Sequence, residues 1–203
     1  MTITNGYTTL AQLRAKLTIP TADTADDTML ENIVEAVSRW IDAYCGRIFY
    51  TTSSETRVYT PTTPLLTITD DIATITSVKI DSGSRAYGTT LASTDYDTLP
   101  FNTSLTVKPI IGLQITPNGT QRFYPTISKS VQVVGTFGVP SGCTWLEQVR
   151  EACEIWAAYV YKMKDAPLGA TGTSALGQES SVPSPPKLAA DLLSYPLRRM
   201  VRP

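Results

Sequence analysis

The stretch 30–46, LENIVEAVSRWIDAYCG, decides the class of fold that we predict for this chain. Its apolar side chains recur at steps of three and four residues, which is the spacing of one face of an α-helix. Gly46 comes directly after this pattern and suits the left-handed conformation that ends many helices. We therefore predict a long amphipathic helix with one buried face. That face comprises Leu30, Ile33, Val34, Val37, Ile41, Tyr44 and Cys45.

A second long amphipathic helix is predicted far along the chain, over residues 144–164. It opens with Thr144 and Glu147 at the spacing of a capping box. Two helices with such apolar faces bury them best against each other, so we expect these two to pack as an antiparallel pair. The apolar stripe of the second helix comprises Trp145, Val149, Ala152, Cys153, Trp156, Val160 and Met163.

A short helix precedes the first long one. Thr9 and Gln12 have capping-box spacing, a leucine stripe follows, and Ile19-Pro20 ends the pattern. The polar turn at 21–28 contains Asp26 and Asp27, which we interpret as caps for the next helix because carboxylates are favoured at helix starts.

The middle of the chain has a β-type pattern. Threonine, valine and isoleucine become frequent there, with proline, glycine and asparagine at short intervals. Alternation in the run 72–80 is imperfect, which predicts a bulge or a strand covered on both faces. We expect an α+β fold: antiparallel helices from both ends of the chain, with an inserted small antiparallel β-barrel or sandwich. The predicted strands are 56–59, 65–68, 72–80, 105–108, 112–116, 121–124 and 131–137.

The last part of the chain is predicted to be a linker followed by an arm. Residues 166–186 are rich in small and polar residues, and the run Ser184-Pro185-Pro186 is typical of a helix start. The resulting division is 1–50 (helical), 51–140 (β insertion), 141–165 (long helix) and 166–203 (linker and C-terminal arm). As hinge residues we predict Pro167, Gly169, Gly172 and Gly177. As residues of the arm that bind a partner we predict Leu188, Leu192, Leu193, Tyr195, Leu197, Arg198, Arg199 and Arg202.

Catalytic chemistry has little support in this sequence. The chain contains no histidine, which removes the commonest general base and metal ligand. The glycines of 172–177 have phosphate-loop spacing, but Gln178-Glu179 stands where Lys-Ser/Thr is required. The compact acidic pairs Asp70/Asp71 and Asp95/Asp97 fit turn chemistry better than catalysis. We expect no catalytic residue, metal or cofactor, and we interpret the three cysteines as small buried side chains.

Both helical ends resemble one known family. The segments YTTLAQLRAKLTI, DDTMLENIVEAVSRWIDAYCGRIFY, WLEQVREACEIWAAYVYKMKDAPLG and LLSYPLRRM resemble head–tail connector proteins (head-completion or adaptor proteins) of long-tailed bacteriophages. The β insertion matches this family only in its place along the chain. The length and threonine content of the insertion, and the long segment 166–186, depart from the family pattern.

The resemblance implies a structural virion protein, assembled in the host cytoplasm and located at the capsid–tail junction. Such proteins resemble subunits of a ring, typically dodecameric, beneath the portal protein. The C-terminal arm would dock on the portal, and the other side of the ring would receive a stopper or tail-completion protein. DNA would pass through the channel without sequence-specific binding. The formal net charge of −1 and the lack of any long apolar run agree with a protein that neither coats DNA nor enters a membrane.

Two alternatives remain open from the sequence. The β region could be a carbohydrate- or peptide-binding sandwich on a virion or cell surface. It could also belong to a hydrolase that uses Asp70/Asp71 or Asp95/Asp97.

Overall fold

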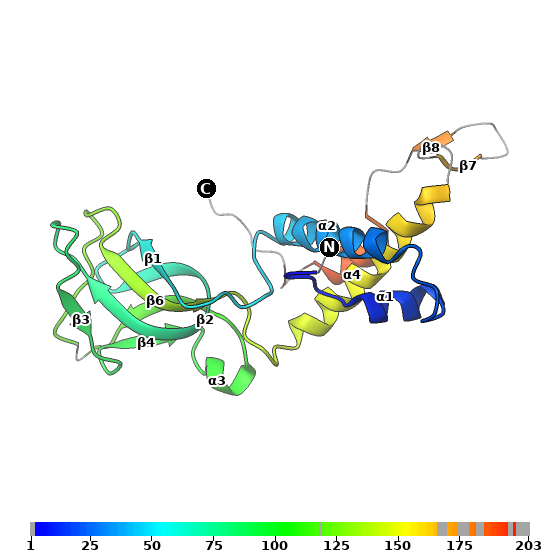
Figure 1. The fold of residues 1–203 in the computed structure, drawn as a ribbon. Helices are drawn as coiled ribbons and strands as arrows, with labels where there is room; N and C mark the ends of the chain where they lie inside the picture. The colour runs from blue at the N-terminus through cyan, green and yellow to red at the C-terminus, as the bar shows by residue number, and fades with distance from the viewer. Residues whose placement is uncertain are drawn as a thin grey trace. The chain divides into compact units, whose positions relative to one another are not determined.

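The chain folds into two compact units in a computed structural model. The structure describes residues 3–117, 119–165, 170–173, 179–181, 185–194 and 197. The first unit combines residues 1–46 with 145–203, and the second consists of residues 47–144. The class is α+β, as predicted (Figure 1).

The first unit is built around the two predicted long helices, α2 (Asp27–Cys45) and α4 (Trp145–Lys162). They pack against each other and run in opposite directions (Figure 1). The stripe of α2 is buried with the exception of Tyr44, and Gly46 follows with the predicted left-handed φ of 65°. On α4 the buried side chains are Val149, Ala152, Cys153, Glu154 and Ala157, so its buried face includes one carboxylate.

The short helix α1 (Leu10–Leu17) contacts both long helices. Its capping box is present as predicted: the backbone N–H of Gln12 donates to the Thr9 hydroxyl, and the Gln12 side chain bonds the Thr9 backbone N–H. The helix ends at Thr18, which has a left-handed φ of 59°, shortly before the predicted stop. Leu13 is fully buried.

The segment predicted as a linker contains regular structure. The 3₁₀ turn η1 (Met163–Asp165) extends α4, and strands β7 (Ala170–Thr173) and β8 (Glu179–Ser181) pair antiparallel. Helix α5 (Lys187–Leu192) follows and packs on α4. Its N-cap is Pro186, so the helix starts later than a serine cap at position 184 predicts.

The second unit is one six-stranded antiparallel sheet, which is not closed into the predicted barrel. Its order is β1-β6-β2-β5-β4, with β3 also paired to β2. The six strands are β1 (Glu55–Tyr59), β2 (Leu66–Ile80), β3 (Thr89–Leu91), β4 (Tyr96–Leu99), β5 (Ile110–Ile115) and β6 (Val131–Phe137). The core includes Ile72, Val78, Leu113, Phe123, Val133 and Phe137.

Strand β2 spans two of the predicted strands in one run. Its pairing with β6 shifts register between Ile72 and Thr74 and again between Ile75 and Ser77, which confirms the predicted irregularity. Gly135 of β6 lies opposite this irregular stretch, where a Cβ atom would come within 2.1 Å of the Thr74 carbonyl oxygen. Glycine therefore allows β2 to approach β6 closely at its bulge.

Two strand predictions are wrong. Residues 105–108 are not a strand, because the one-turn helix α3 (Thr103–Thr106) occupies the β4–β5 connection between two left-handed residues, Asn102 and Val107. Residues 121–124 form no strand either. Phe123 there enters the core, and its N–H donates to the carbonyl of Pro64. Strands β3 and β4 were not predicted because they are short and lie among turn residues.

Candidate protein–protein interaction sites

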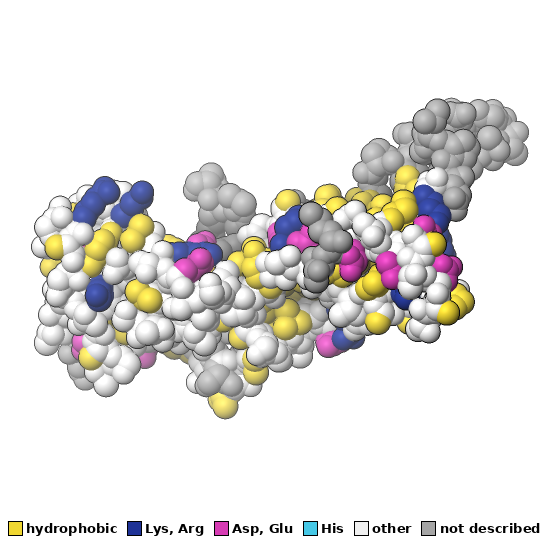
Figure 2. All heavy atoms as spheres, viewed as in Figure 1, with side chains coloured by type: hydrophobic (Ala, Val, Ile, Leu, Met, Phe, Trp, Pro, Cys, Tyr) yellow, Lys and Arg dark blue, Asp and Glu magenta, His cyan; other side chains and the backbone are white. Residues whose placement is uncertain are grey.

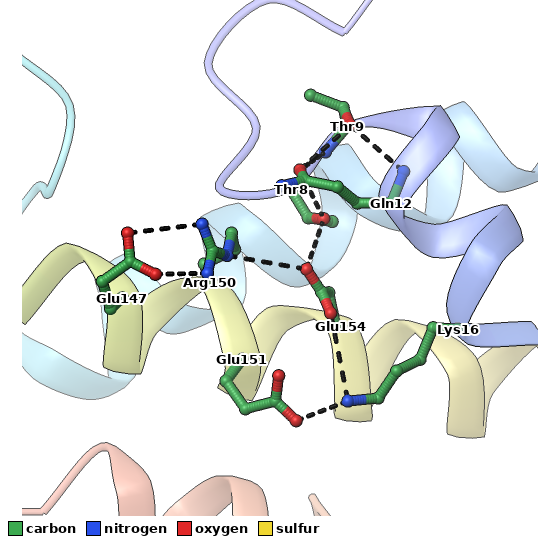
Figure 3. A network of polar contacts seen from close by, with 8 residues as sticks. All are labelled: Thr8, Thr9, Gln12, Lys16, Glu147, Arg150, Glu151 and Glu154. Atoms are coloured by element: carbon green, nitrogen blue, oxygen red, sulfur yellow. Dashed lines mark hydrogen bonds and ion pairs between the residues drawn. The ribbon is translucent and has the colours of Figure 1, made fainter.

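Helix α1 is fixed to α4 by a polar network centred on Glu154 (Figure 3). The Thr8 hydroxyl donates to Glu154 at 3.2 Å, and Lys16 lies 3.9 Å from the other carboxylate oxygen. Lys16 also pairs with Glu151, and Arg150 lies 3.8 Å from Glu154. Because Glu154 is almost fully buried, these partners offset the cost of its desolvation.

The segment before α1 is fixed across α2. The backbone N–H of Tyr7 donates to the Ser38 hydroxyl at 3.1 Å, and the Tyr7 hydroxyl bonds the Asp42 carboxylate. Burial raises the pKa of Asp42, against the lowering effect of the Tyr7 hydrogen bond and of Arg39. Arg39 donates to the carbonyl of Asn5 at 2.8 Å. The N-terminal segment is thus part of the helical unit.

The start of α2 is tied to the end of α4. Asp26 occupies the N-cap position but makes no side-chain cap hydrogen bond, so its predicted role is wrong. Its carboxylate instead accepts hydrogen bonds from Lys164 and from the Tyr161 hydroxyl, and both lower its pKa. Asp27 forms an ion pair with Arg14 at 2.6 Å.

The predicted C-terminal arm is partly integrated into the helical unit. Leu193 and Leu197 are buried, and the Leu193 carbonyl lies 4.0 Å from the Cys45 sulfur on α2. Leu188 is 60% exposed and Leu192 is half-buried. Among the predicted hinge residues, Gly172 lies in β7. The remaining predicted residues lie outside the described ranges: Pro167, Gly169, Gly177, Tyr195, Arg198, Arg199 and Arg202.

A hollow of about 310 Å³ lies beside α5. It is lined by Lys16 of α1, by one face of α4 and by Pro186, which precedes α5. The α4 residues in its wall are Ile155, Ala158, Tyr159 and Lys162. The hollow is thus an apolar depression with lysines among its lining residues.

Four half-buried aromatic rings, which we name the aromatic strip, link α2 with α4. Tyr44 stacks on Trp40 with ring centroids 4.9 Å apart, and Trp40 contacts Trp156 at 5.5 Å. Trp156 stacks on Tyr159, which also lines the hollow. The strip therefore connects the helix pair to the depression, and aromatic side chains of this kind are enriched at protein interfaces.

The β unit carries an exposed apolar group that we name the apolar ridge. It comprises Phe101, Leu105 and Val107 around α3, with Leu105 80% exposed and Phe101 59% exposed. Val107 has φ of 45°, a conformation that a β-branched residue rarely adopts. Sequence reasoning missed this ridge because Leu105 and Val107 alternate with threonine, as in a strand.

The two acidic pairs do not form paired carboxylates. Asp70 and Asp71 point to opposite faces of β2, since Asp70 is exposed while Asp71 is buried. Asp71 pairs with buried Arg47 at 3.4 Å, and Asp70 pairs with Arg57 at 3.1 Å. Asp95 accepts the backbone N–H of Ala92, which is the expected turn chemistry.

The three cysteines are buried within the two units. Burial raises the pKa of Cys153 to about 11, which leaves it protonated and unreactive at neutral pH.

In the part of the chain that the structure describes, no group of three or more Cys, Asp or Glu residues could hold a metal ion. No helix among those residues is long and apolar enough to span a bilayer.

The sequence profile of phage gp6-like head–tail connector proteins matches residues 7–111. This match covers α1, α2, strands β1 to β4 and the first two residues of β5, which is more than half of the chain. The chain belongs to this family of connector proteins. This match confirms the predicted resemblance to head–tail connector proteins. The connector family consists of structural virion proteins.

Two solved structures have a similar fold. A chain of the neck of an empty gene transfer agent (GTA) particle, computed with C6 symmetry, has a TM-score of 0.51 and 18% identity, with 83% of each chain covered. A chain of the native GTA virion has a TM-score of 0.52 and 16% identity, covering 95% of this connector and 89% of that chain. A sequence comparison with curated proteins returns no match. At these identities the similarity concerns the fold alone.

Proposed function

We propose that this connector is a ring subunit beneath the portal of a DNA-filled phage head. The ring joins the head to a stopper or tail-completion protein, and DNA crosses its channel without sequence-specific contacts. The family match over residues 7–111 is the observation that carries this proposal. The similar chain in a GTA neck computed with C6 symmetry supports it, because six and twelve copies are both compatible with that symmetry. We favour twelve.

A closed ring requires two different surfaces of each subunit to be complementary. The connector has two such candidates, the aromatic strip on its helical unit and the apolar ridge on its β unit. Leu105 is too exposed to contribute to the core of its own unit, and its burial in a neighbour would remove apolar surface from water. We propose that both surfaces are buried between ring subunits.

Assembly of the purified protein tests this role for the ridge. Leu105→Ser should abolish or weaken ring formation, measured by mass photometry, in the presence of portal protein. Leu65→Ser provides a control, because Leu65 is a 45% exposed leucine in a loop of the same unit. Normal rings from the Leu105 variant would remove the ridge from the proposal.

The portal contact is proposed for the C-terminal arm. Since Leu193 and Leu197 are buried within the chain, only Leu188 and the half-buried Leu192 remain as accessible leucines of the described arm. Arg198, Arg199 and Arg202 supply cations that suit acidic groups on a protein partner. The arm would therefore bind through one face of α5 and its basic terminus, while the other face stays on α4.

A portal pull-down with the full chain tests this contact. We expect Leu188→Glu to lose portal binding, together with the triple change of Arg198, Arg199 and Arg202 to Glu. Met29→Glu is a control at another exposed apolar side chain of the helical unit, which is 39% exposed on α2. If both arm variants are retained on portal as well as the wild type, the arm is not the docking segment.

A further inference from the structure

Two loops at one end of the β sheet carry basic side chains that are exposed to solvent. The first, residues 81–88, connects β2 to β3, and the second, residues 124–130, precedes β6. Arg85 and Lys129 are exposed in these loops, and Lys79 is half-buried on the adjoining end of β2. On the face shown in Figure 2, Lys and Arg side chains gather at one end of this unit, at upper left in the view.

The first loop is organised by a single carboxylate. Asp81 accepts the backbone N–H groups of Gly83 and Arg85 at 2.8 and 2.7 Å and the hydroxyl of Ser84 at 2.9 Å. It also accepts the N–H groups of Ala86 and Tyr87 at 3.2 and 3.4 Å. These donors compensate the negative charge of Asp81 inside the loop, so the carboxylate is not available to pair with Arg85.

The second loop is clamped to the first. The Tyr87 hydroxyl donates to the carbonyl of Lys129 at 2.7 Å, and the N–H of Asp81 donates to the carbonyl of Ser130 at 2.9 Å. The backbone N–H of Lys129 donates to the Thr60 hydroxyl. Arg85, Tyr87 and Lys129 have φ values of 58°, 48° and 57°. Such left-handed residues persist only where the surrounding contacts fix them, and clusters of them often mark functional sites.

Ion pairing distinguishes these basic side chains from other arginines of the β unit. Within the described residues, no ion pair involves Lys79, Arg85 or Lys129, whereas Arg57 and Arg47 of the same unit are both paired. The first loop surrounds Arg85 with small exposed residues (Ser82, Gly83, Ser84 and Ala86), and Gly88 is exposed at its end. Protein interfaces normally add several aromatic or large apolar anchors to their charges. In these two loops the exposed large hydrophobic side chain is Tyr124, at 37%. A charge contact with small polar neighbours fits nucleic-acid phosphates better.

We infer that loops 81–88 and 124–130 bind the phosphate backbone of double-stranded DNA. This inference rests on the proposed function, in which DNA passes the connector. Duplex DNA presents one negative charge per ~1.7 Å of its axis. Cations that the protein fold holds at fixed positions can therefore contact phosphates at many positions along the duplex. Hydroxyl and backbone N–H groups of the loops can add contacts that carry no sequence information. Two or three cations per subunit make each contact weak, which suits DNA that must move past.

Fluorescence anisotropy with the full chain and a labelled 30-bp duplex of arbitrary sequence provides the test. The double variant Arg85→Gln/Lys129→Gln should reduce the slope of log K against log salt by about 2, at ~0.9 per phosphate contact. Between 50 and 200 mM salt the wild type should therefore lose about tenfold more affinity than the variant. The double variant Lys108→Gln/Lys187→Gln removes the same net charge from exposed lysines elsewhere and should keep the wild-type slope.

Three results would overturn the inference: no DNA binding by the wild type at about 50 mM salt, equal slopes for the two double variants, or equal affinity for polyglutamate of matched charge. The last result would point to an acidic protein partner. The portal pull-down tests the proposed connector role separately, because it contains no DNA. Either proposal can therefore fail without the other. A loop variant that still binds portal but has lost DNA affinity would support both conclusions.

Discussion

The hydroxyl of Thr8 donates to the carboxylate of Glu154, which is 146 residues further along the chain. This contact ties the segment before α1 to the middle of α4, and the entire β unit lies between the two residues in the sequence. The helical unit is therefore closed by residues from both ends of the chain, as the helix pair α2–α4 also requires. The β unit can then vary in length without changing the helical unit of the connector.

Removal of the Glu154 carboxylate should destabilise the helical unit. Glu154→Ala would leave the Thr8 hydroxyl without this acceptor in a buried site and should lower the free energy of unfolding by about 1–3 kcal/mol. The neighbouring Glu151 pairs with the same lysine from a 46% exposed position. Glu151→Ala should therefore cost at most about 1 kcal/mol. Urea unfolding followed by tryptophan fluorescence measures both, and equal costs would show that Glu154 is not the centre of the network.

Two leucines of the C-terminal arm should differ strongly in their contribution to stability. Leu193 is 1% exposed, so Leu193→Ala should lower the free energy of unfolding by about 2–5 kcal/mol through loss of burial and the cavity left behind. Leu188→Ala should change it by less than about 0.5 kcal/mol, since its side chain faces solvent. Thermal unfolding of the full chain distinguishes them. If Leu193→Ala were neutral, α5 would not be docked on α4.

The helical unit was predictable from the sequence because its signals are strong and local. The stripe from Leu30 to Cys45, the Thr9–Gln12 capping box and Gly46 all act over a few residues, and each is found in the structure. The role of Glu154 was not predictable, because its partner Thr8 is close only after the chain has folded. Asp26 shows the same limit: its bonds to Tyr161 and Lys164 replace the local cap that sequence spacing favours.

The β unit was predictable as a class but not strand by strand. Leu105 and Val107 alternate with threonine, yet Asn102 and Val107 adopt left-handed conformations that turn this run into α3. Strand propensity depends on neighbours in space, and a short apolar run carries no information about them. For the same reason the sequence did not identify the apolar ridge. The basic loops were missed because Arg85 and Lys129 are 44 positions apart in the sequence.

Gly135 should be indispensable for the sheet. A Cβ atom at this position would lie 2.1 Å from the Thr74 carbonyl oxygen, so backbone would have to move at the β2 bulge. Gly135→Ala should therefore lower the free energy of unfolding by about 1–3 kcal/mol or prevent folding of the β unit. At Gly88 nothing lies within 4 Å of such a Cβ atom, and Gly88→Ala serves as the control. Circular dichroism and urea unfolding report both variants; similar stabilities would contradict this role of Gly135.

The order of loop 81–88 should depend on pH through the protonation of the Asp81 carboxylate. Burial raises its pKa, but hydrogen bonds from Arg85, Gly83, Ser84 and Tyr87 outweigh that effect and lower the pKa to about 2. A carboxyl whose pKa is depressed on folding contributes stability above its unfolded pKa of about 3.9, and this contribution is lost as the pH falls toward 2. The stability difference between the wild type and Asp81→Asn should thus be constant above pH ~5 and shrink between pH ~4 and ~2.

Amide hydrogen exchange resolves this effect at the loop itself. At neutral pH, Asp81→Asn should accelerate exchange at the backbone N–H groups of Gly83, Arg85 and Ala86, because a neutral amide oxygen is a weaker and less versatile acceptor than a carboxylate. Asp97→Asn, at an exposed position of β4, is the matched control and should leave these amides protected. Unchanged exchange in the Asp81 variant would mean that the strained backbone of the loop is fixed by other contacts, such as the hydrogen bond from Tyr87 to Lys129.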